Sequence, residues 1–487
     1  MRQLSGHDAN FLYSDTVHAN ANVTFVQIYD QSTVAGGKLR FKSILAHIES
    51  RLQRTPIFRS RLQRVPLELD YPYWVEDEHF DLEYHVRHIA LPKPGDWRQF
   101  CIQASRIHSR ALDMNRPLWE IYVIEGLDSV DELPEGSFAL LTKVHRAAVD
   151  IENRNPIVDA LHDTAPLPPP ATPPEPWFPE GAPNAWNLMV RGAFNAMVSP
   201  LRLVGPLTRL APAAMAFAAD MMRPEHQAAT RFHSVVSAHR VFDTRRFMLA
   251  EFHRIRGLVP GATVNDAVLA VCAGGLRRYL AAQGELPAAD LKAYAPLALP
   301  DADPMPEPDR PAGPMQVQLG TNLADPVERL AWIQEQTASS PDLARAEPRG
   351  AQSLPTCTIT SVPCSAEPLY LIGAHMTYYS AIMPIADGMG LVFAVTSYGG
   401  RVLVSPTSCR ELMPDPQAFT QCVRDSFQEY LALAPAAPRA APVAARSARR
   451  GGSASGRRPP SGPKARKAAT VLQAAPVGRR RSTTPRR

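Results

Sequence analysis

The sequence predicts a mixed α/β fold of two domains followed by a basic tail. Its 487 residues, 45% of them hydrophobic, are enough for more than one core. Strand-like and helix-like segments alternate along the chain. Nine prolines in residues 166–183 exclude a helix or a central strand there and predict an extended linker. We therefore expect domains at 1–165 and 231–435, a Pro-rich linker and amphipathic crossover at 166–230, and a disordered tail at 436–487.

In the first domain, residues 24–29 and 119–125 are rich in β-branched and aromatic residues, which favours strands. Residues 41–53 place apolar side chains three and four positions apart, which predicts a helix. Residues 138–144 (FALLTKV) form an apolar run typical of a buried strand.

In the second domain, residues 262–283 predict the clearest helix, with Thr263 or Asn265 as its cap and Gly284 as its stop. Strands are expected at 356–362, 374–385 and 390–398, and a last helix at 418–433. Residues 186–224 are apolar and cationic. This stretch is open to two interpretations: a membrane-surface segment, or short helices that pack over the domain seam.

The positive charge of the chain resides in its tail. The formal net charge is +5, and residues 437–487 hold 14 Lys and Arg with no acidic residue, so residues 1–436 carry 5 − 14 = −9. An acidic body argues against a nucleic-acid groove in the fold, and we expect no specific nucleic acid as a partner. The tail, too polar to fold, is interpreted either as a solvated extension or as a tether to anionic lipid or nucleic acid.

We expect a cytoplasmic protein, because no run of 18 uncharged apolar residues occurs and the N-terminal residues lack the apolar core of a signal peptide. The six cysteines are scattered without CxxC spacing. They fit reduced thiols better than a zinc site or a disulfide framework.

One segment carries residues suited to chemistry. His145 and Arg146 follow directly on the strand predicted at 138–144, and Asp150 comes four residues later. A histidine at the end of a buried strand can present a base to a cleft, with the carboxylate holding the loop. A histidine satisfied within the structure, beside a loop salt bridge, is the alternative.

Eight blocks in order give the sequence its resemblance to the bacterial wax ester synthase/acyl-CoA:diacylglycerol acyltransferase family. They run from LSGHDANFL at residues 4–12, which is similar to the family's opening LSxxDAxFL, through RPLWEIYVIEGL at 116–127 and NDAVLAVCAGGLRRYL at 265–280, to SYGGRVLVSPTSCRELMPD at 397–415. The resemblance implies the two-domain CoA-dependent acyltransferase fold, in which each domain is a mixed sheet flanked by helices. It also implies long-chain acyl transfer from acyl-CoA to a fatty alcohol or diacylglycerol.

The resemblance implies no cofactor, with acyl-CoA as a substrate, and no metal at His79, His85 and His88. The partners it implies are acyl-CoA, a long-chain alcohol or diacylglycerol, and an anionic membrane or lipid-inclusion surface that the cytoplasmic chain would contact peripherally. Asn265 and Asp266 fall on the family's Asn-Asp motif near its substrate tunnel, which makes them candidate substrate-binding residues. Helix capping explains the same pair equally well.

The central motif departs from the family pattern HHxxxDG, in which the second histidine is the general base and the aspartate holds the loop. In this chain the corresponding residues are His145-Arg146-Ala-Ala-Val-Asp150-Ile151. His145 and Asp150 are kept as candidate catalytic-motif residues, and Arg146 occupies the position of the base. A guanidinium cannot accept a proton near neutrality. The sequence thus predicts an impaired acyltransferase or, as the alternative, a catalytically silent homologue that binds acyl-CoA or neutral lipid.

Overall fold

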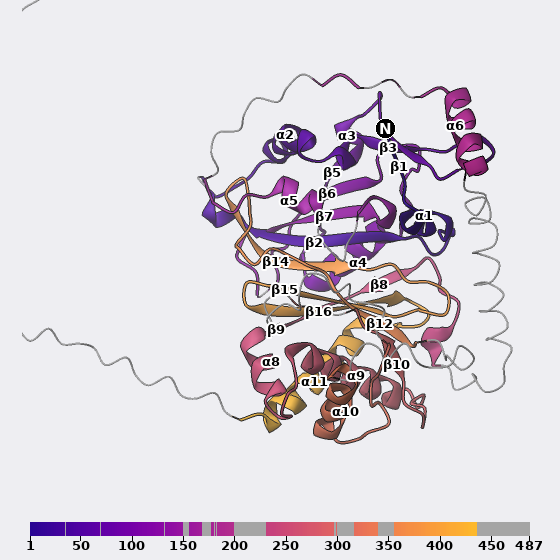
Figure 1. Cartoon of the computed structure of the whole chain (residues 1–487). Coiled ribbons are helices and arrows are strands. Elements are labelled where there is room, and N and C mark those ends of the chain that lie inside the picture. The colour runs from indigo at the N-terminus through magenta and orange to yellow at the C-terminus, as the bar shows by residue number, and fades with distance from the viewer. Residues whose placement is uncertain are drawn as a thin grey trace, which may run out of the picture. The chain divides into compact units, whose positions relative to one another are not determined.

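Two mixed β-sheets with helices packed on them make up most of the described residues in this computed structural model (Figure 1). The structure describes residues 1–34, 36–68, 70–130, 132–149, 155–167, 177–179, 181, 183–198, 230–296, 299, 316–338 and 355–435. By their contacts, residues Met1–Ala437 form one unit and Pro438–Arg487 a second. The expected tail, most of the expected linker, Asp150 and Ile151 lie outside the described residues.

The first sheet has six strands in the order β13-β14-β2-β7-β6-β5, and only β5 and β6 pair in parallel. Its strands are β2 (Asn22–Asp30), β5 (Val86–Ala90), β6 (Trp119–Glu125), β7 (Phe138–His145), β13 (Tyr370–Leu371) and β14 (Ala374–Ile382). β2 and β7 lie in the middle of the sheet. Their nearly continuous burial explains why their sequences read as apolar runs.

β14 comes from the C-terminal half of the chain but belongs to the first sheet. It pairs antiparallel with β2 from His375↔Asp30 to Ile382↔Thr24, with one irregularity between Met376 and Tyr378. The N-terminal residues therefore do not complete this sheet alone. This pairing differs from the expectation that each half of the chain builds a sheet of its own.

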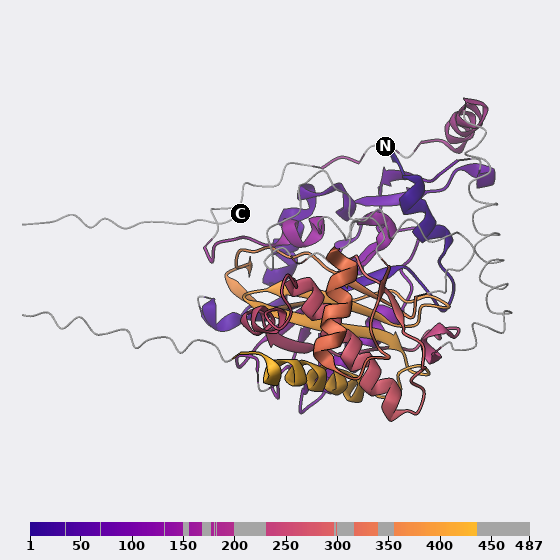
Figure 2. The same cartoon turned by 60° about the horizontal axis from the view of Figure 1, so that its bottom comes forward.

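The second sheet has seven strands in the order β11-β10-β12-β15-β16-β8, with β9 also paired to β16. Its strands are β8 (Arg240–Phe242), β9 (Arg245–Met248), β10 (Lys292–Tyr294), β11 (Gln316–Gln318), β12 (Cys357–Ser361), β15 (Val392–Tyr398) and β16 (Arg401–Cys409). The helices gathered on it are α8 (Leu249–Arg256), α9 (Val264–Ala282), α10 (Pro326–Ala338) and α11 (Pro416–Leu433). Figure 2 shows this helical layer with α11 in yellow.

Close packing of α9 on α11 requires a glycine. A methyl group at Gly275 would lie 2.7 Å from Cγ2 of Val423, nearer than carbon atoms approach each other. The glycine pair in the apolar helix of the sequence is thus explained by helix contact.

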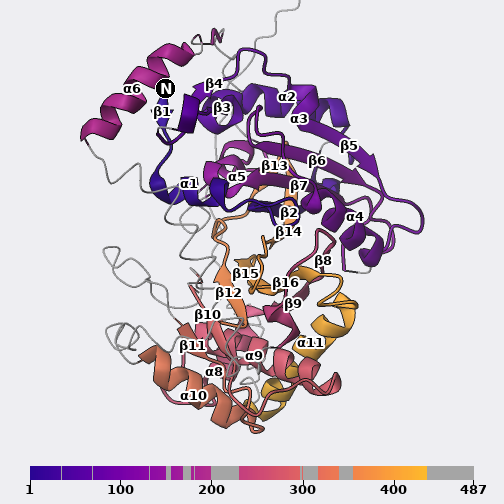
Figure 3. The ribbon, with the colours of Figure 1, turned by 90° about the vertical axis from the view of Figure 1, so that its right-hand side faces the viewer.

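Helices cover both faces of the first sheet. The helix α4 (Trp97–Ser109) packs Phe100, Ala104 and Ile107 against one face. The helices α2 (Phe41–Arg51) and α5 (Pro156–Leu161) pack on the other, where Ile48 and Leu161 join the core. α4 also contacts β8 of the second sheet, so it lies between the two sheets (Figure 3).

The remaining described elements lie around the N-terminus. A three-stranded antiparallel sheet consists of β1 (Arg2–Gln3), β4 (Tyr73–Glu76) and β3 (Ser60–Gln63), and the helices nearby are α1 (Gly6–Tyr13), α3 (Leu82–His85) and α6 (Ala185–Val198). α6 touches this region through Leu188, which packs with Val65, Tyr73 and Val75 (Figure 3). Among the helices in the described residues, none has the length and apolar character needed to cross a bilayer.

The strands and helices expected from periodicity are confirmed at β2, β6, β7, α2, α9, β12, β14, β15 and α11, with no end shifted by more than three residues. Thr263, one of the two candidate caps, is the cap of α9. The short strands β8 and β9 and the helix α4 were not expected from the sequence. The fold class, mixed sheets flanked by helices, is confirmed.

A buried histidine fastens α5 to the first sheet. Nε2 of His162 lies 2.6 Å from the Tyr29 hydroxyl, and Nδ1 lies 2.6 Å from the carbonyl oxygen of Val158. Because a carbonyl can only accept, Nδ1 donates and Nε2 accepts the hydroxyl proton. Burial lowers the pKa of His162 to about 4, so its native form is neutral.

We expect the free energy of unfolding to fall as the pH falls from about 6.5 to about 4, because the unfolded chain then holds a proton that native His162 rejects. The His162 contribution over this window is about 3 kcal/mol. Urea unfolding at pH 7 and pH 4 should show a smaller loss for His162→Gln than for wild type. The exposed His7→Gln serves as the control. Equal losses in wild type and His162→Gln would contradict this assignment.

Candidate functional site

The candidate motif begins at the last residue of the central strand β7. Its last residue, His145, pairs in register with Asn22 at the start of β2 and is 1% exposed. The chain then leaves the sheet in a single 3-10 turn, Arg146–Ala148, which packs against α1. The motif therefore lies where a buried strand meets the N-terminal helix.

Both ring nitrogens of His145 have partners within the protein. The backbone N–H of Ala147 lies 3.1 Å from Nδ1, and Nε2 lies 3.0 Å from Oδ2 of Asp15. Because a backbone N–H can only donate, Nδ1 must accept, and the neutral ring then carries its proton on Nε2 and donates it to Asp15. The only nitrogen lone pair of the neutral imidazole therefore accepts a hydrogen bond from the turn. We call this arrangement, in which His145 holds the 3-10 turn and is itself held by Asp15, the His145 clamp.

Asp15 ties a second segment to the same turn. Its Oδ1 accepts the N–H of Ala21 at 2.7 Å, while the carbonyl oxygen of Ala21 accepts the N–H of Arg146 at 3.0 Å. Three oxygen atoms thus hold residues 15–21 against the end of β7 and its 3-10 turn. They are the two carboxylate oxygens of Asp15 and the carbonyl oxygen of Ala21. No pattern in the sequence predicts this contact, because Asp15 lies 130 residues before His145.

Arg146 is half-buried beside α1. Its guanidinium carbon lies 4.1 Å from the ring centroid of Phe11, a cation–π arrangement. A charge held in this way can stabilise a neighbouring negative charge, but it cannot take a proton from an alcohol. Asp150, the acidic residue of the motif, lies outside the described residues.

A buried lysine near the motif was missed from the sequence. The Lys143 ammonium is fully buried, donates to the carbonyl oxygens of Ile107 (3.1 Å) and Arg110, and lies 3.7 Å from a Glu120 carboxylate oxygen. Burial lowers the pKa of Lys143 to about 8. Its three polar partners indicate that it fastens α4 to the sheet. The sequence feature that could have revealed this residue is a lysine within the mostly apolar run at residues 138–144.

Asn265 and Asp266 lie in the first turn of α9. Oδ2 of Asp266 accepts the N–H of Thr263 (2.7 Å) and its hydroxyl (2.8 Å), and Oδ1 accepts the hydroxyl of Thr337 on α10 at 2.7 Å. Asp266 therefore caps α9 and joins it to α10. The side-chain oxygen of Asn265 is buried and has no hydrogen-bond partner among the described residues. A role of either residue in substrate binding stays a prediction.

Two large cavities lie along α4, on the side of the second sheet. Their volumes are about 930 and 860 Å³, and neither is lined by His145, Arg146, Asn265 or Asp266. In the part of the chain that the structure describes, no three metal-ligating side chains gather, and the cysteines are free thiols. The motif and the cavities are thus distinct features of the same fold.

Comparison with known proteins identifies the family of this chain. Residues 4–268 match the model of the wax ester synthase/diacylglycerol acyltransferase catalytic domain, and residues 338–430 match the C-terminal domain of the same family. The chain belongs to this family.

Several relatives are similar along most of the chain. A Mycobacterium tuberculosis protein named provisionally as a diacylglycerol O-acyltransferase is 31% identical over 465 residues, 88% of this chain and 89% of its own. The O-acyltransferase WSD of Acinetobacter baylyi is 29% identical over 395 residues, 74% of this chain and 83% of its own. The structure of the wax ester synthase/diacylglycerol acyltransferase from Marinobacter aquaeolei VT8 covers 88% of this chain and 98% of its own, with a TM-score of 0.63 at 23% identity, which supports the fold.

We expect Asp15→Ala to lower the free energy of unfolding by about 1 to 3 kcal/mol. The ring Nε2–H of the buried His145 and the backbone N–H of Ala21 then lose their acceptor. Urea unfolding measures the change, and Asp128→Ala, at an exposed aspartate, is the matched control. Nitrogen-15 chemical shifts should show the proton of neutral His145 on Nε2. A proton on Nδ1, or an unchanged stability, would contradict the clamp.

Proposed function

We propose that this protein transfers a long-chain acyl group from acyl-CoA to a fatty alcohol or a diacylglycerol, at a rate lowered by the loss of the general base. The observation that carries the proposal is the family match over both halves of the chain together with arginine at the base position. Ester formation needs the hydroxyl proton removed as the oxygen attacks the thioester carbon, with CoA leaving as the thiol. Positioned acid–base catalysis is worth about 100- to 10,000-fold in rate.

His145 is a poor substitute for the missing base. Its lone pair accepts the N–H of Ala147, and its N–H donates to Asp15, so taking a substrate proton requires breaking the turn that follows β7. Arg146 retains its proton near neutrality, and its positive charge suits stabilisation of the developing oxyanion. This arrangement supports slow transfer in which substrate binding and charge stabilisation supply most of the acceleration.

The second candidate function is a catalytically silent homologue that binds acyl-CoA or neutral lipid. The engaged state of both His145 nitrogens favours it, because the described part of the motif then offers no group that can accept the hydroxyl proton. Turnover separates the two candidates directly.

We expect the purified chain to form ester from palmitoyl-CoA and hexadecanol, or from palmitoyl-CoA and a diacylglycerol, about 100- to 10,000-fold more slowly than a family member with an intact HHxxxDG motif. Arg146→His should raise the rate, because it restores a base at the family position. Arg40→His, at an exposed arginine elsewhere, should not.

Two results would decide against the slow enzyme. Wild-type turnover equal to that of an intact-motif relative, abolished in a folded His145→Gln variant, would assign the base to His145. Absence of ester in both wild type and Arg146→His, with acyl-CoA binding retained, would favour the silent homologue.

We also propose that the protein contacts an anionic membrane or lipid-inclusion surface through α6. Trp186, Val190 and Phe194 are four residues apart and 64%, 52% and 65% exposed, so they form one apolar stripe on the outer side of the helix. The opposite side is anchored by Leu188, and by Asn195, whose amide donates to Asp70 at 2.7 Å. A Trp and Phe stripe of this kind favours the membrane interface.

Flotation with phosphatidylcholine/phosphatidylglycerol vesicles tests this contact. Trp186→Ser with Phe194→Ser should abolish most of the binding, whereas Val235→Ser with Leu433→Ser, at exposed apolar residues elsewhere, should not. Binding through the apolar stripe should resist salt, because screening weakens only charge contacts. Unchanged flotation of the α6 variant, or binding that vanishes in high salt, would instead favour the basic tail as the tether.

A further inference from the structure

The loop at residues 15–21, which we call the junction loop, is closed by its own hydrogen bonds. Oδ1 of Asp15 accepts the N–H of Ala21 at 2.7 Å, so the two ends of the loop lie together. Within the loop, the N–H of Thr16 donates to the carbonyl oxygen of Ala19, and the N–H of Ala19 donates to the hydroxyl of Thr16, both at 2.9 Å. A short loop tied at these three points moves as one body.

The base of the junction loop holds the motif. Oδ2 of Asp15 lies 3.0 Å from Nε2 of His145, and the carbonyl oxygen of Ala21 accepts the N–H of Arg146 at 3.0 Å. Arg146 occupies the position of the general base in the family pattern, so the junction loop fixes the backbone of that position. A shift of the loop therefore moves the residue on which proton removal would depend.

The tip of the junction loop is held by the C-terminal half of the chain. The carbonyl oxygen of His18 accepts a hydrogen bond from Nη2 of Arg240 at 2.7 Å, and Nε2 of His18 lies 3.3 Å from Oδ2 of Asp387. Arg240 is the first residue of β8, and Asp387 lies between β14 and β15. The loop thus spans from the end of β7 to two separate segments of the C-terminal half.

Arg240 and Asp387 are themselves fixed in place. The Arg240 guanidinium, which is buried, also donates to the carbonyl oxygen of Ser237, and Oδ1 of Asp387 accepts the N–H of Val236 at 2.9 Å. Burial lowers the pKa of Arg240, while the negative charge of Asp387 acts in the opposite direction. The two side chains therefore hold the tip of the loop from one preorganised segment.

We propose that Arg240 and Asp387 are positioning residues for the motif, which hold the junction loop at its tip and thereby fix residue 146 and the His145 clamp at its base. The inference deepens the proposed function and rests on it for the effect on turnover. A group that must remove a proton loses rate when it is misplaced by about 1 Å, even by a change far from the chemistry. Contacts across the two halves can thus act on the reaction through the motif.

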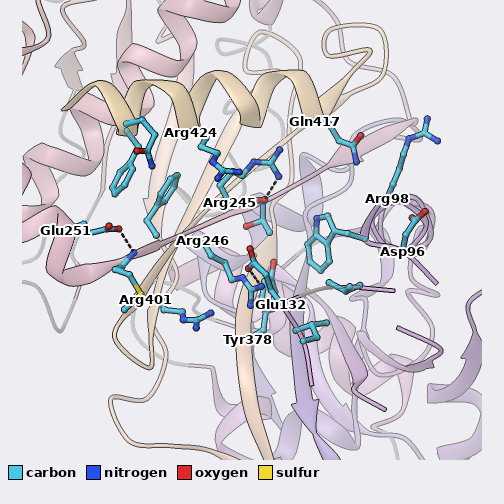
Figure 4. Close-up of a pocket in the computed structure, with 18 of the residues that line it drawn as sticks. Asp96, Arg98, Glu132, Arg245, Arg246, Glu251, Tyr378, Arg401, Gln417 and Arg424 are labelled. Atoms are coloured by element: carbon cyan, nitrogen blue, oxygen red, sulfur yellow. Dashed lines mark hydrogen bonds and ion pairs between the residues drawn. The ribbon is translucent and has the colours of Figure 1, made fainter. Parts of the chain in front are cut away.

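A different contact between the two halves provides a matched control. Arg246 of β9 pairs with Glu132, which lies between β6 and β7, and Figure 4 shows the two side chains at the first cavity. Among the hydrogen bonds and ion pairs of the described residues, neither side chain bonds to the junction loop. Breaking this pair removes a contact between the halves but leaves the loop in place.

Hydrogen exchange of the full chain, measured by mass spectrometry with residue resolution, tests the inference without turnover. Arg240→Leu should speed exchange of the Ala21 and Arg146 amides about tenfold, the loss of about one charge-assisted hydrogen bond. Asp387→Ala, at a side chain that is 35% exposed, should act in the same direction and serves as the variant that disturbs folding less. Amides at residues 140–142, in the middle of β7, should exchange as in wild type.

Two further variants separate positioning from general stabilisation. Arg240→Lys keeps a positive charge and a donor, so it should retain most of the protection that Arg240→Leu loses. Arg246→Leu, the matched control, should leave exchange of the Ala21 and Arg146 amides unchanged. In the Arg146→His background, Arg240→Leu should lower kcat for ester formation about tenfold and leave KM for palmitoyl-CoA unchanged.

The outcomes distinguish this inference from the proposed function. Unchanged exchange at Ala21 and Arg146 in both Arg240→Leu and Asp387→Ala would overturn the inference, and so would equal acceleration at residues 140–142, which reports a global loss of stability. An unchanged kcat in a background that forms ester would also overturn it. Absence of ester in every variant would overturn the proposed function alone, because exchange still decides whether the two residues hold the motif.

Discussion

The pairing of β14 with β2 is the constraint on which the rest of the structure depends. A strand from the C-terminal half completes the first sheet, and β14 also contacts β15 and β16 of the second sheet. Because the two strands are some 350 residues apart, their pairing closes a long loop of chain at an entropic cost and ties the two halves of the chain together. It places α4 between the sheets, where α4 forms a wall of both large cavities.

Polar contacts across the same seam fix its geometry. The buried Asp243 accepts the indole N–H of Trp97 on α4 and lies beside Arg245 of β9. Arg240 donates to the carbonyl oxygen of His18 at 2.7 Å, and His18 lies 3.3 Å from Asp387. Asp243 and Arg240 are buried, and a buried charge without its partners is costly, so these two contacts favour one relative position of the elements around the cavities.

Local pattern was enough to predict much of this fold, but not its contacts. The apolar runs of β2 and β7 and the period of α9 follow from burial, and the Thr263 cap follows from its own side chain. The partner of His145 could not be predicted, since Asp15 reaches it from a loop with no periodic signal. The two cavities along α4 could not be predicted from the sequence either. The arginines that line them lie on α4, β9, β16 and α11, and they become neighbours only through tertiary structure.

Binding and proton transfer make different demands on this chain. The two cavities along α4 are lined by many residues from several elements, so their shape depends on no single side chain. Removal of the hydroxyl proton depends on one lone pair at one position, and arginine has none to offer there. The arrangement around His145 reinforces this separation, since Ala147 and Asp15 hold both ring nitrogens. The shape of the fold and the removal of a proton can therefore change independently in this chain, because they depend on different residues.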